Sequence, residues 1–237
     1  MHCRFVCVTG SDTGVGKTVL ASLVTRFLRA RGQAVAALKP VCSGGREDAI
    51  RLWEAAGRVL PLDRVNPWHF RAPLAPPIAV RRSAQTLRWS ALLRQVRKAS
   101  QGFEIVVVEG AGGLLSPMAE RNDCRDLIKE LRASVFVVVP NRLGAVNQAR
   151  LVLAALPSAA ARRAVVVLSA PAVSDRATST NAALLSAFFP AARITQLPRL
   201  KQPFSKRILP QVGKLLERLL EPMVPGTTTA GQRAEMF

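Results

Sequence analysis

A glycine-rich stretch that ends in Lys and Thr follows the first strand-like segment, at residues 10–18 (GSDTGVGKT). Glycines let backbone N–H groups turn toward phosphate oxygens, and the N-terminus of a following helix adds partial positive charge. Lys17 would reach the β- and γ-phosphates of a nucleotide, and the Thr18 hydroxyl would hold magnesium. The strict pattern has Gly where this chain has Ser11, so the sequence predicts a variant phosphate-binding loop.

Two acidic residues are candidates for completing a magnesium site, because Mg²⁺ takes oxygen ligands. Glu109 follows the apolar run 105–108 and precedes Gly110. It would therefore lie at the carboxyl edge of a parallel sheet, where ligands of such folds bind. Asp48 lies in a polar turn, and its alternative role is simply to begin a helix.

A second basic residue, Lys39, ends another short apolar run, 34–38. A Lys held at a strand end beside a phosphate loop can stabilise charge on a transferring phosphoryl group. The alternative is a solvated Lys at the start of a loop. Cys42 lies in the same loop and is interpreted as a small buried residue.

Short β-branched runs alternate with longer helical patterns along the chain. Strands are predicted at 4–9, 34–38, 105–108, 135–139 and 165–168, and helices at 19–32, 89–99, 146–156, 182–188 and 208–220. Because strands that are apolar throughout are typical of a parallel sheet covered on both faces, the sequence predicts an α/β fold of the P-loop type with a mostly parallel sheet. The stretch 61–82, with five prolines, is predicted to be a loop-rich excursion.

The composition, with 49% hydrophobic and 21% charged residues, is typical of a chain with a packed core. No apolar run approaches the ~20 residues of a membrane span, and we expect no cleavable signal. We therefore expect a cytoplasmic protein without membrane partners, with one domain over residues 1–221 and a flexible tail over 222–237.

The net charge is +19, from 34 basic and 15 acidic residues. Nucleic-acid binding is one interpretation of this charge. A basic but otherwise ordinary surface is favoured, because the Arg residues are scattered and basic stripes with interleaved aromatics are missing.

Five segments together resemble the dethiobiotin synthetases, the ATP-dependent ligases of biotin synthesis. They are SDTGVGKT (11–18), KPVCSG (39–44) with the following Asp48, VNPWHFRAPLAPP (65–77), VVEGAGGLLSPM (107–118) and NRLGAVNQ (141–148). They occur in the family's order and spacing, and the resemblance extends to about Leu200. The combination is far more specific than a phosphate-binding loop alone.

The resemblance implies a homodimer and a reaction. One amine of 7,8-diaminononanoate captures carbon dioxide as a carbamate, the carbamate attacks the γ-phosphate of ATP, and the second amine closes the ureido ring and expels phosphate. Because the carbamate is itself the nucleophile, catalysis needs positioning and charge more than a strong protein base.

The resemblance also implies the roles of individual residues. Thr13, Lys17 and Lys39 would be catalytic, and Mg²⁺ would be held by Thr18, Asp48 and Glu109. The phosphates of ATP would be wrapped by Gly14, Val15, Gly16, Lys17, Thr18 and Val19 and by Glu109, Gly110, Ala111 and Gly112. The substrate would lie beside Thr13 and Ser43, and Leu143, Gly144 and Asn147 would reach the substrate of the other subunit.

The nucleotide base would lie beside Ser169 and beside the turn formed by Pro198, Arg199 and Leu200. Members of the family often carry Asn at the position of Ser169. Ser offers one short hydroxyl where Asn offers an acceptor and two donors, so the sequence predicts a weakened reading of adenine.

Two other functions stay open from the residues alone. A partitioning ATPase of the P-loop class would suit the +19 charge through non-specific DNA binding. Such proteins usually carry a second Lys early in the loop, where this chain has Ser11, Asp12 and Thr13. The other is a related ligase that acts on a different amine.

Overall fold

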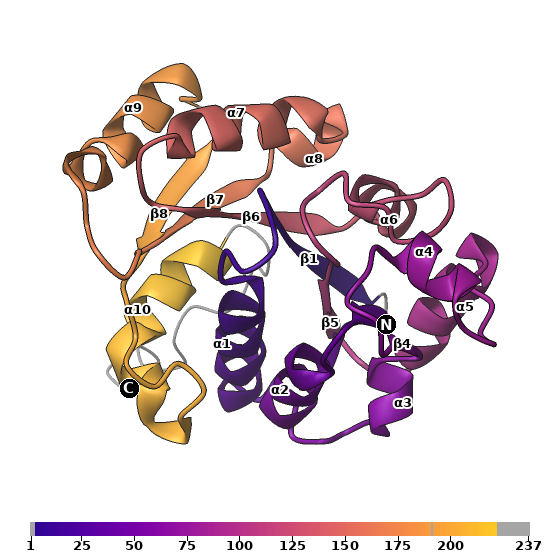
Figure 1. Cartoon of the computed structure of the whole chain (residues 1–237). Coiled ribbons are helices and arrows are strands. Elements are labelled where there is room, and N and C mark those ends of the chain that lie inside the picture. The colour runs from indigo at the N-terminus through magenta and orange to yellow at the C-terminus, as the bar shows by residue number, and fades with distance from the viewer. Residues whose placement is uncertain (1–2, 191, 222–237) are drawn as a thin grey trace, which may run out of the picture.

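The centre of the molecule is a six-stranded sheet in the order β2-β5-β1-β6-β7-β8, in which every neighbouring pair is parallel (Figure 1). The computed structural model describes residues 3–190 and 192–221. The strands are β1 (Arg4–Gly10), β2 (Val35–Leu38), β5 (Ile105–Glu109), β6 (Ser134–Pro140), β7 (Val165–Ser169) and β8 (Arg193–Leu197). A small parallel pair, β3 (Val41–Ser43) and β4 (Trp68–Phe70), lies apart from this sheet.

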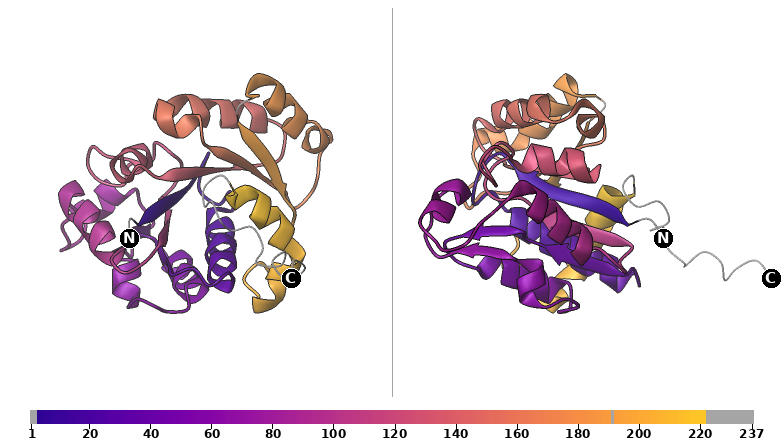
Figure 2. Two further views of the ribbon diagram at one scale, coloured as in Figure 1. Left: turned by 180° about the vertical axis from the view of Figure 1, so that it is seen from behind. Right: turned by 90° about the vertical axis from the view of Figure 1, so that its right-hand side faces the viewer.

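Helices cover both faces of the large sheet (Figure 2). One face carries α1 (Lys17–Ala30), α2 (Glu47–Ala55) and α10 (Leu209–Leu220). The other carries α5 (Trp89–Ala99), α6 (Cys124–Leu131), α7 (Ala145–Ala155), α8 (Ser158–Ala161) and α9 (Asn181–Phe188). The remaining short helical elements are α3 (Leu62–Val65), α4 (Pro76–Arg81), η1 (Arg176–Ser179) and η2 (Lys206–Ile208).

Alternate residues of each central strand pack into opposite halves of the core. In β1, Val6 and Val8 pack with α1 and α10, whereas Cys7 packs with the helices of the opposite face. All three are fully buried or nearly so. Both faces must therefore be apolar, which is why these strands appear in the sequence as continuous hydrophobic runs. The predicted P-loop-type α/β class with a parallel sheet is confirmed.

One prediction about the elements was wrong, and one strand of the large sheet was not predicted. The stretch 61–82 is not a loop-rich excursion, because it contains α3, β4 and α4. Two of its prolines occupy positions that are compatible with helices. Pro61 immediately precedes α3, and Pro76 is in the first turn of α4, where a backbone N–H has no helical partner. The edge strand β8 was missed because its sequence, RITQL, mixes polar and apolar residues and buries little.

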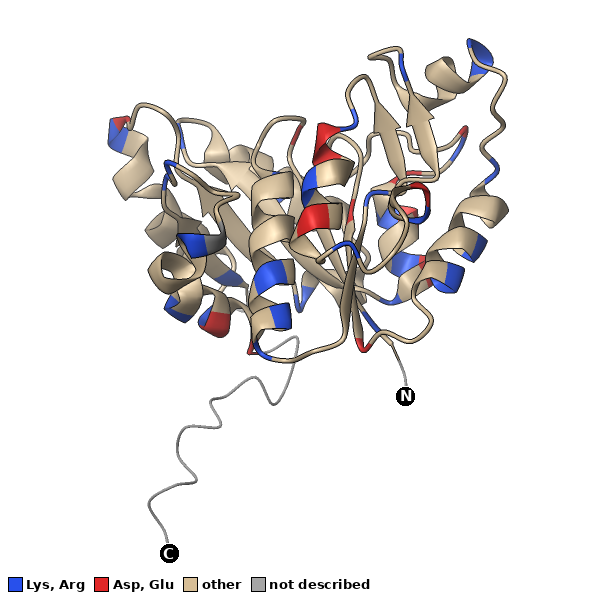
Figure 3. Cartoon of the chain, turned by 90° about the horizontal axis from the view of Figure 1, so that it is seen from below, with Lys and Arg blue, Asp and Glu red and all other residues tan. Residues whose placement is uncertain are grey.

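The predicted single domain over residues 1–221 stays a prediction, and the predicted tail over 222–237 lies outside the described residues. Within the described ranges, no helix has both the length and the apolar character needed to cross a membrane. Lys and Arg are spread over separate elements rather than gathered on one of them (Figure 3).

Candidate functional site

The phosphate-binding loop runs from the end of β1 to the start of α1. Gly16 precedes α1 with φ of 102°, a left-handed conformation that favours glycine. A Cβ atom at Gly10 would lie 2.7 Å from the carbonyl oxygen of Val138, so this position also requires glycine. The Lys17 side chain is buried and folds back over the loop, where its Nζ donates to the carbonyl oxygen of Asp12 at 2.5 Å.

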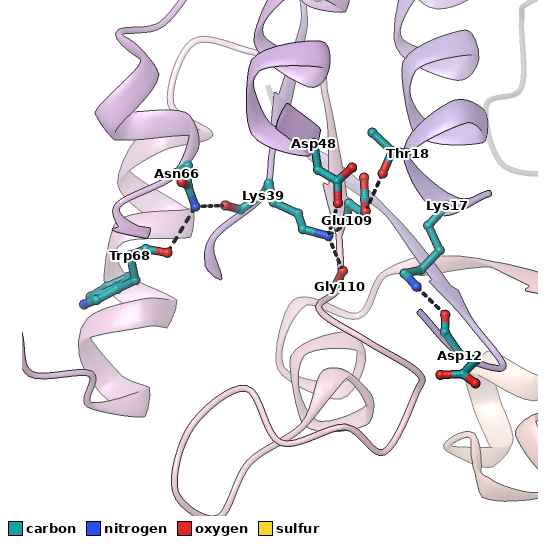
Figure 4. Close-up of polar contacts among 9 residues, drawn as sticks. All are labelled: Asp12, Lys17, Thr18, Lys39, Asp48, Asn66, Trp68, Glu109 and Gly110. Carbon is teal, nitrogen blue, oxygen red and sulfur yellow. Dashed lines mark hydrogen bonds and ion pairs between the residues drawn. The ribbon is translucent and has the colours of Figure 1, made fainter. Parts of the chain in front are cut away.

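Glu109 and Lys39 form the buried centre of a polar cluster beside this loop, in which the Asp48 side chain is half-exposed (Figure 4). Glu109 Oε1 accepts hydrogen bonds from Lys39 Nζ at 2.6 Å and from Thr18 Oγ1 at 2.9 Å. Lys39 Nζ also donates to the carbonyl oxygen of Gly110 and lies 3.6 Å from Asp48 Oδ2. Glu109 Oε2 is buried and has no hydrogen-bond partner among the described residues.

The register of the sheet explains why these side chains meet. Val108 of β5 is paired with Leu38 of β2, and Glu109 is paired with Val8 of β1. Lys39 and Glu109 therefore leave the sheet side by side at its carboxyl edge, where the phosphate-binding loop also begins. Lys39 is buried, so the alternative of a solvated Lys at a loop start is wrong.

The two lysines differ in their electrostatic surroundings. Burial lowers the pKa of Lys17, and the positive charge of Lys39 lowers it further. Burial also disfavours the charged form of Lys39, but the carboxylates of Glu109 and Asp48 outweigh it and raise the pKa of Lys39. The charged form is therefore favoured more strongly at Lys39 than at Lys17. Burial raises the pKa of Cys42 to about 11, so this thiol stays protonated and is no nucleophile.

A buried amide holds the strand end that carries Lys39 (Figure 4). Asn66 Nδ2 donates to the carbonyl oxygens of Lys39 at 2.7 Å and Trp68 at 3.2 Å. Arg46, which immediately precedes α2, donates in turn to Asn66 Oδ1 at 3.0 Å. Because α2 carries Asp48, this chain of hydrogen bonds ties together the two elements that bring Lys39 and Asp48 to the cluster.

A cavity of about 630 Å³ opens over the phosphate-binding loop and the polar cluster. Many of the residues predicted for the site line it: Thr13, Gly14, Gly16, Lys17, Thr18, Val19, Lys39, Ser43, Asp48, Glu109, Ala111 and Gly112. Ser43 Oγ is buried with no hydrogen-bond partner among the described residues, so it is free to contact a polar ligand. The cavity is large enough for a small molecule together with a triphosphate.

A second cavity, of about 300 Å³, shares Gly14, Gly16 and Val19 with the first. It brings together the residues predicted to lie beside the base: Val15, Ser169, Pro198, Arg199 and Leu200. Ser169 Oγ donates to the carbonyl oxygen of Val15 at 2.8 Å, so its hydroxyl proton is already engaged. The two cavities meet along the phosphate-binding loop. A nucleotide could therefore place its phosphates in the first cavity and its base in the second.

The three residues predicted to reach the other subunit lie outside both cavities. Gly144 immediately precedes α7, Leu143 is 81% exposed, and Asn147 is exposed on the first turn of the helix. Ser11 Oγ donates to Gln148 Oε1 at 3.2 Å, so a hydrogen bond links α7 to the phosphate-binding loop.

Several lining residues were not singled out from the sequence. They include Arg51, the proline-rich segment 73–76, Ser116, Pro117 and Phe204. The prolines and Ser116 lie within the segments quoted for the resemblance, so the resemblance could have indicated them as site residues. Arg51 follows Asp48 by three residues and so shares its face of α2, which the spacing alone could have indicated.

The parallel sheet with a phosphate-binding loop between its first strand and first helix defines a P-loop protein that binds nucleoside triphosphates. A family model described as an AAA domain matches residues 4–205. Together with the relatives described next, this match shows that the chain belongs to the ATP-dependent dethiobiotin synthetase family.

The relatives carry that name in several bacteria. The ATP-dependent dethiobiotin synthetase BioD of Anaeromyxobacter dehalogenans (strain 2CP-C) is 41% identical over 157 residues, which cover 65% of this chain and 70% of that protein. Those of Xanthomonas oryzae pv. oryzae (strain PXO99A) and Akkermansia muciniphila are each 38% identical, with 63% and 65% of this chain and 70% and 72% of those proteins covered.

Among solved structures, the signal recognition particle receptor FtsY from Elizabethkingia anophelis in complex with GDP superposes with a TM-score of 0.52. It is 16% identical, and the match covers 82% of this chain and 57% of that one. At this identity the likeness shows the P-loop fold alone.

Proposed function

We propose that this chain is an ATP-dependent dethiobiotin synthase that forms the ureido ring from 7,8-diaminononanoate, carbon dioxide and ATP. Membership of the family supports the reaction. The observation that carries the proposal is the buried cluster of Lys39 and Glu109 beside the phosphate-binding loop. The reaction brings a carbamate against a γ-phosphate, and two such anions need fixed positive charge at the point where they meet.

The residues of the site divide this work between them. The backbone of the phosphate-binding loop and Lys17 would hold the phosphate chain, and Lys39 would lie against the carbamate and the transferred phosphoryl group. Ser43 and Thr13 would orient the amines with their hydroxyls. The amine nitrogen attacks carbon dioxide, the resulting carbamate oxygen attacks the γ-phosphorus and ADP leaves, and the second amine displaces phosphate as the ring closes. No protein nucleophile is required.

The residues present fit a magnesium ion. Thr18, Asp48 and Glu109 supply a hydroxyl and two carboxylates, all of them hard oxygen donors, and Glu109 Oε2 is buried with no hydrogen-bond partner in the described part of the chain. No group of three or more His, Cys, Asp or Glu side chains within the described ranges forms a metal cage. Mg²⁺ is usually held by one or two carboxylates together with substrate phosphates and water, which suits the donors Thr18, Asp48 and Glu109. When bound, it would neutralise phosphate charge.

The proposal is tested by measuring phosphate release from the purified chain. We expect release to require ATP, Mg²⁺, 7,8-diaminononanoate and bicarbonate together, and dethiobiotin to appear in equal amount by mass spectrometry. A homologous series of diamines tests the alternative of a related ligase. If a diamine of another length or another amine supports faster turnover than 7,8-diaminononanoate, the chain is an ATP-dependent ligase but the proposed substrate is wrong.

The proposal extends to a homodimer in the cytoplasm. Apolar side chains lie exposed around α7: Leu143 at 81%, Val173 at 83% and Leu151 at 63%. Exposure of this extent over neighbouring elements is typical of a protein interface. Its place at the start of α7 suits the segment predicted to reach the partner's substrate.

The dimer proposal gives a direct prediction. We expect light scattering to give about twice the 25.6 kDa of one chain, and Leu143→Asp to give the monomer, because an apolar contact would be replaced by a charge. Asn147→Ala should raise the KM for the diamine more than the KM for ATP. Val59→Asp, at an exposed apolar residue away from α7, is the control that should leave the mass unchanged. An active wild-type monomer would exclude the shared site.

Nucleobase selectivity is predicted to be weak. Pro140, Pro171, Pro198 and Pro203 line the second cavity and have no backbone N–H to offer. Ala170 N already donates to Leu197 O, and Ser169 Oγ to Val15 O. A site rejects a wrong base when that base leaves polar groups of the site without hydrogen-bond partners. A site with few free polar groups has little such penalty and therefore discriminates weakly between bases.

We therefore expect turnover with ATP, CTP, GTP and UTP at subsaturating concentration to differ by about tenfold or less, which is about 1.4 kcal/mol. Ser169→Ala is the matched control. Because the Ser169 hydroxyl donates to the carbonyl oxygen of Val15 in the phosphate-binding loop, this variant should weaken all four nucleotides alike. A preference for ATP of a hundredfold or more would show that backbone groups read adenine unaided.

A further inference from the structure

Arg51 is a cationic side chain at the P-loop cavity to which neither the family motif nor the polar cluster assigns a role. It lies on α2, three residues after Asp48, and lines the cavity with Val19. Its guanidinium lies over the ring of Phe204, with the Cζ atom 3.9 Å from the ring centroid. Within the described part of the chain it has no hydrogen bond and no carboxylate partner. Its donors are therefore free.

Phe204 is itself held in place. Arg26, on α1, donates hydrogen bonds from Nη1 to the carbonyl oxygens of Phe204 and Ser205, the latter at 2.8 Å. The ring is half-buried, and Phe204 lines the same cavity as Arg51. Cation–π contact with a fixed ring restricts the long Arg side chain and directs it without using its N–H donors.

The charge balance of the cavity points to an anion at Arg51. The cationic side chains that line it are Lys17, Lys39 and Arg51, and the acidic ones are Asp48 and Glu109. Lys39 is already paired with both carboxylates. Lys17 and Arg51 are the two lining cations without a carboxylate partner among the described residues, and a guanidinium without such a partner is suited to phosphate oxygens, which it can bind with two parallel hydrogen bonds.

The position of Arg51 indicates which part of the nucleotide it would contact. The P-loop cavity and the base cavity share Val19, and Phe204 of the first cavity is next to Pro203 of the second. We propose that Arg51, held by the ring of Phe204, binds the phosphate chain of the nucleoside triphosphate where it passes from the phosphate-binding loop toward the base. This rests on the proposed function, since it takes ATP as the ligand of the loop.

The test is isothermal titration of the full chain with ATP, ADP and AMP in Mg²⁺, together with the KM for the diamine. We expect Arg51→Ala to weaken ATP and ADP about tenfold each, the effect of one charge-assisted hydrogen-bonded contact, with the KM for the diamine unchanged. Arg51→Lys should recover only part of the loss, because an ammonium group stacks and pairs less well. Phe204→Leu should give a loss of about threefold, because Arg51 then loses its support.

The control is Arg58→Ala. Arg58 also stacks on an aromatic ring, that of Trp53 at 4.6 Å, but it lies outside the cavity and should leave nucleotide affinity unchanged. Melting temperatures verify that each variant is folded. ATP and ADP affinities of Arg51→Ala within twofold of wild type would overturn the inference and leave the proposed function intact. A folded wild type that binds no ATP would overturn the proposed function as well.

Discussion

Lys39→Ala should lower kcat by about 10²–10³, the usual effect of removing one preorganised charge from a reacting centre. Lys39 Nζ is buried against Glu109 at 2.6 Å and against the carbonyl oxygen of Gly110, so its position is fixed before any ligand arrives. Its charge has most effect when the oxygens of carbamate and phosphate converge, which happens only in the chemical step. The measurement is phosphate release at saturating substrates, compared with the Kd for ATP.

The same substitution should also lower stability, because it leaves the buried Glu109 carboxylate without its cation. Melting temperature and the fraction of folded protein are therefore measured beside kcat. Lys129→Ala, at an exposed Lys on α6, is the control for loss of an ammonium group. The expected pattern is a large fall in kcat with a much smaller change in the Kd for ATP. Near-normal turnover in Lys39→Ala would show that Lys39 only holds the structure together.

Lys17→Ala should lower kcat/KM for ATP by a similar factor, about 10²–10³, but with a different pattern. Lys17 lies at the end of the phosphate-binding loop, and its Nζ donates a hydrogen bond to the carbonyl oxygen of Asp12. It would bind the β- and γ-phosphates in the ground state as well as in the transition state. Its loss should therefore weaken ATP binding and slow phosphoryl transfer together.

The measurement is the Kd for ATP by titration, and kcat by phosphate release, on the same preparation. Stability should change less than in Lys39→Ala, because Lys17 is not ion-paired with Glu109 and its removal leaves no carboxylate uncompensated. The Lys39→Ala protein serves as the comparison, since it should lose kcat and keep most of its affinity. ATP affinity of Lys17→Ala equal to wild type would contradict the assigned role.

The large sheet was predictable where burial dictates the sequence. Strands such as β5, buried on both faces, must be apolar throughout, and their hydrophobic runs matched the structure to within one or two residues. The small strands β3 and β4 were not predictable, because three residues carry too little pattern. The edge strand β8 was missed because only Leu197 of its five residues is buried, so its sequence mixes polar and apolar residues.

The phosphate-binding loop was predictable because its chemistry is local. Consecutive residues supply the glycines, Lys17 and Thr18, and the adjoining strand and helix give them their geometry. The motifs at Lys39, Asp48 and Glu109 were recognisable one by one from the resemblance. Their mutual contacts were not, since residues 39 and 109 meet only through the pairing of β2 with β5 and of β5 with β1.

The sequence by itself thus determined the class of fold, the family and the ligand of the loop, because each depends on local patterns or on motifs read in order along the chain. Tertiary structure alone decided that Lys39 is buried against Glu109, that the Ser169 hydroxyl faces the loop, and that Arg51 lies over Phe204. These contacts join residues 70 to 154 positions apart. They depend on strand register and helix packing, which place side chains in space by the fit of the whole core.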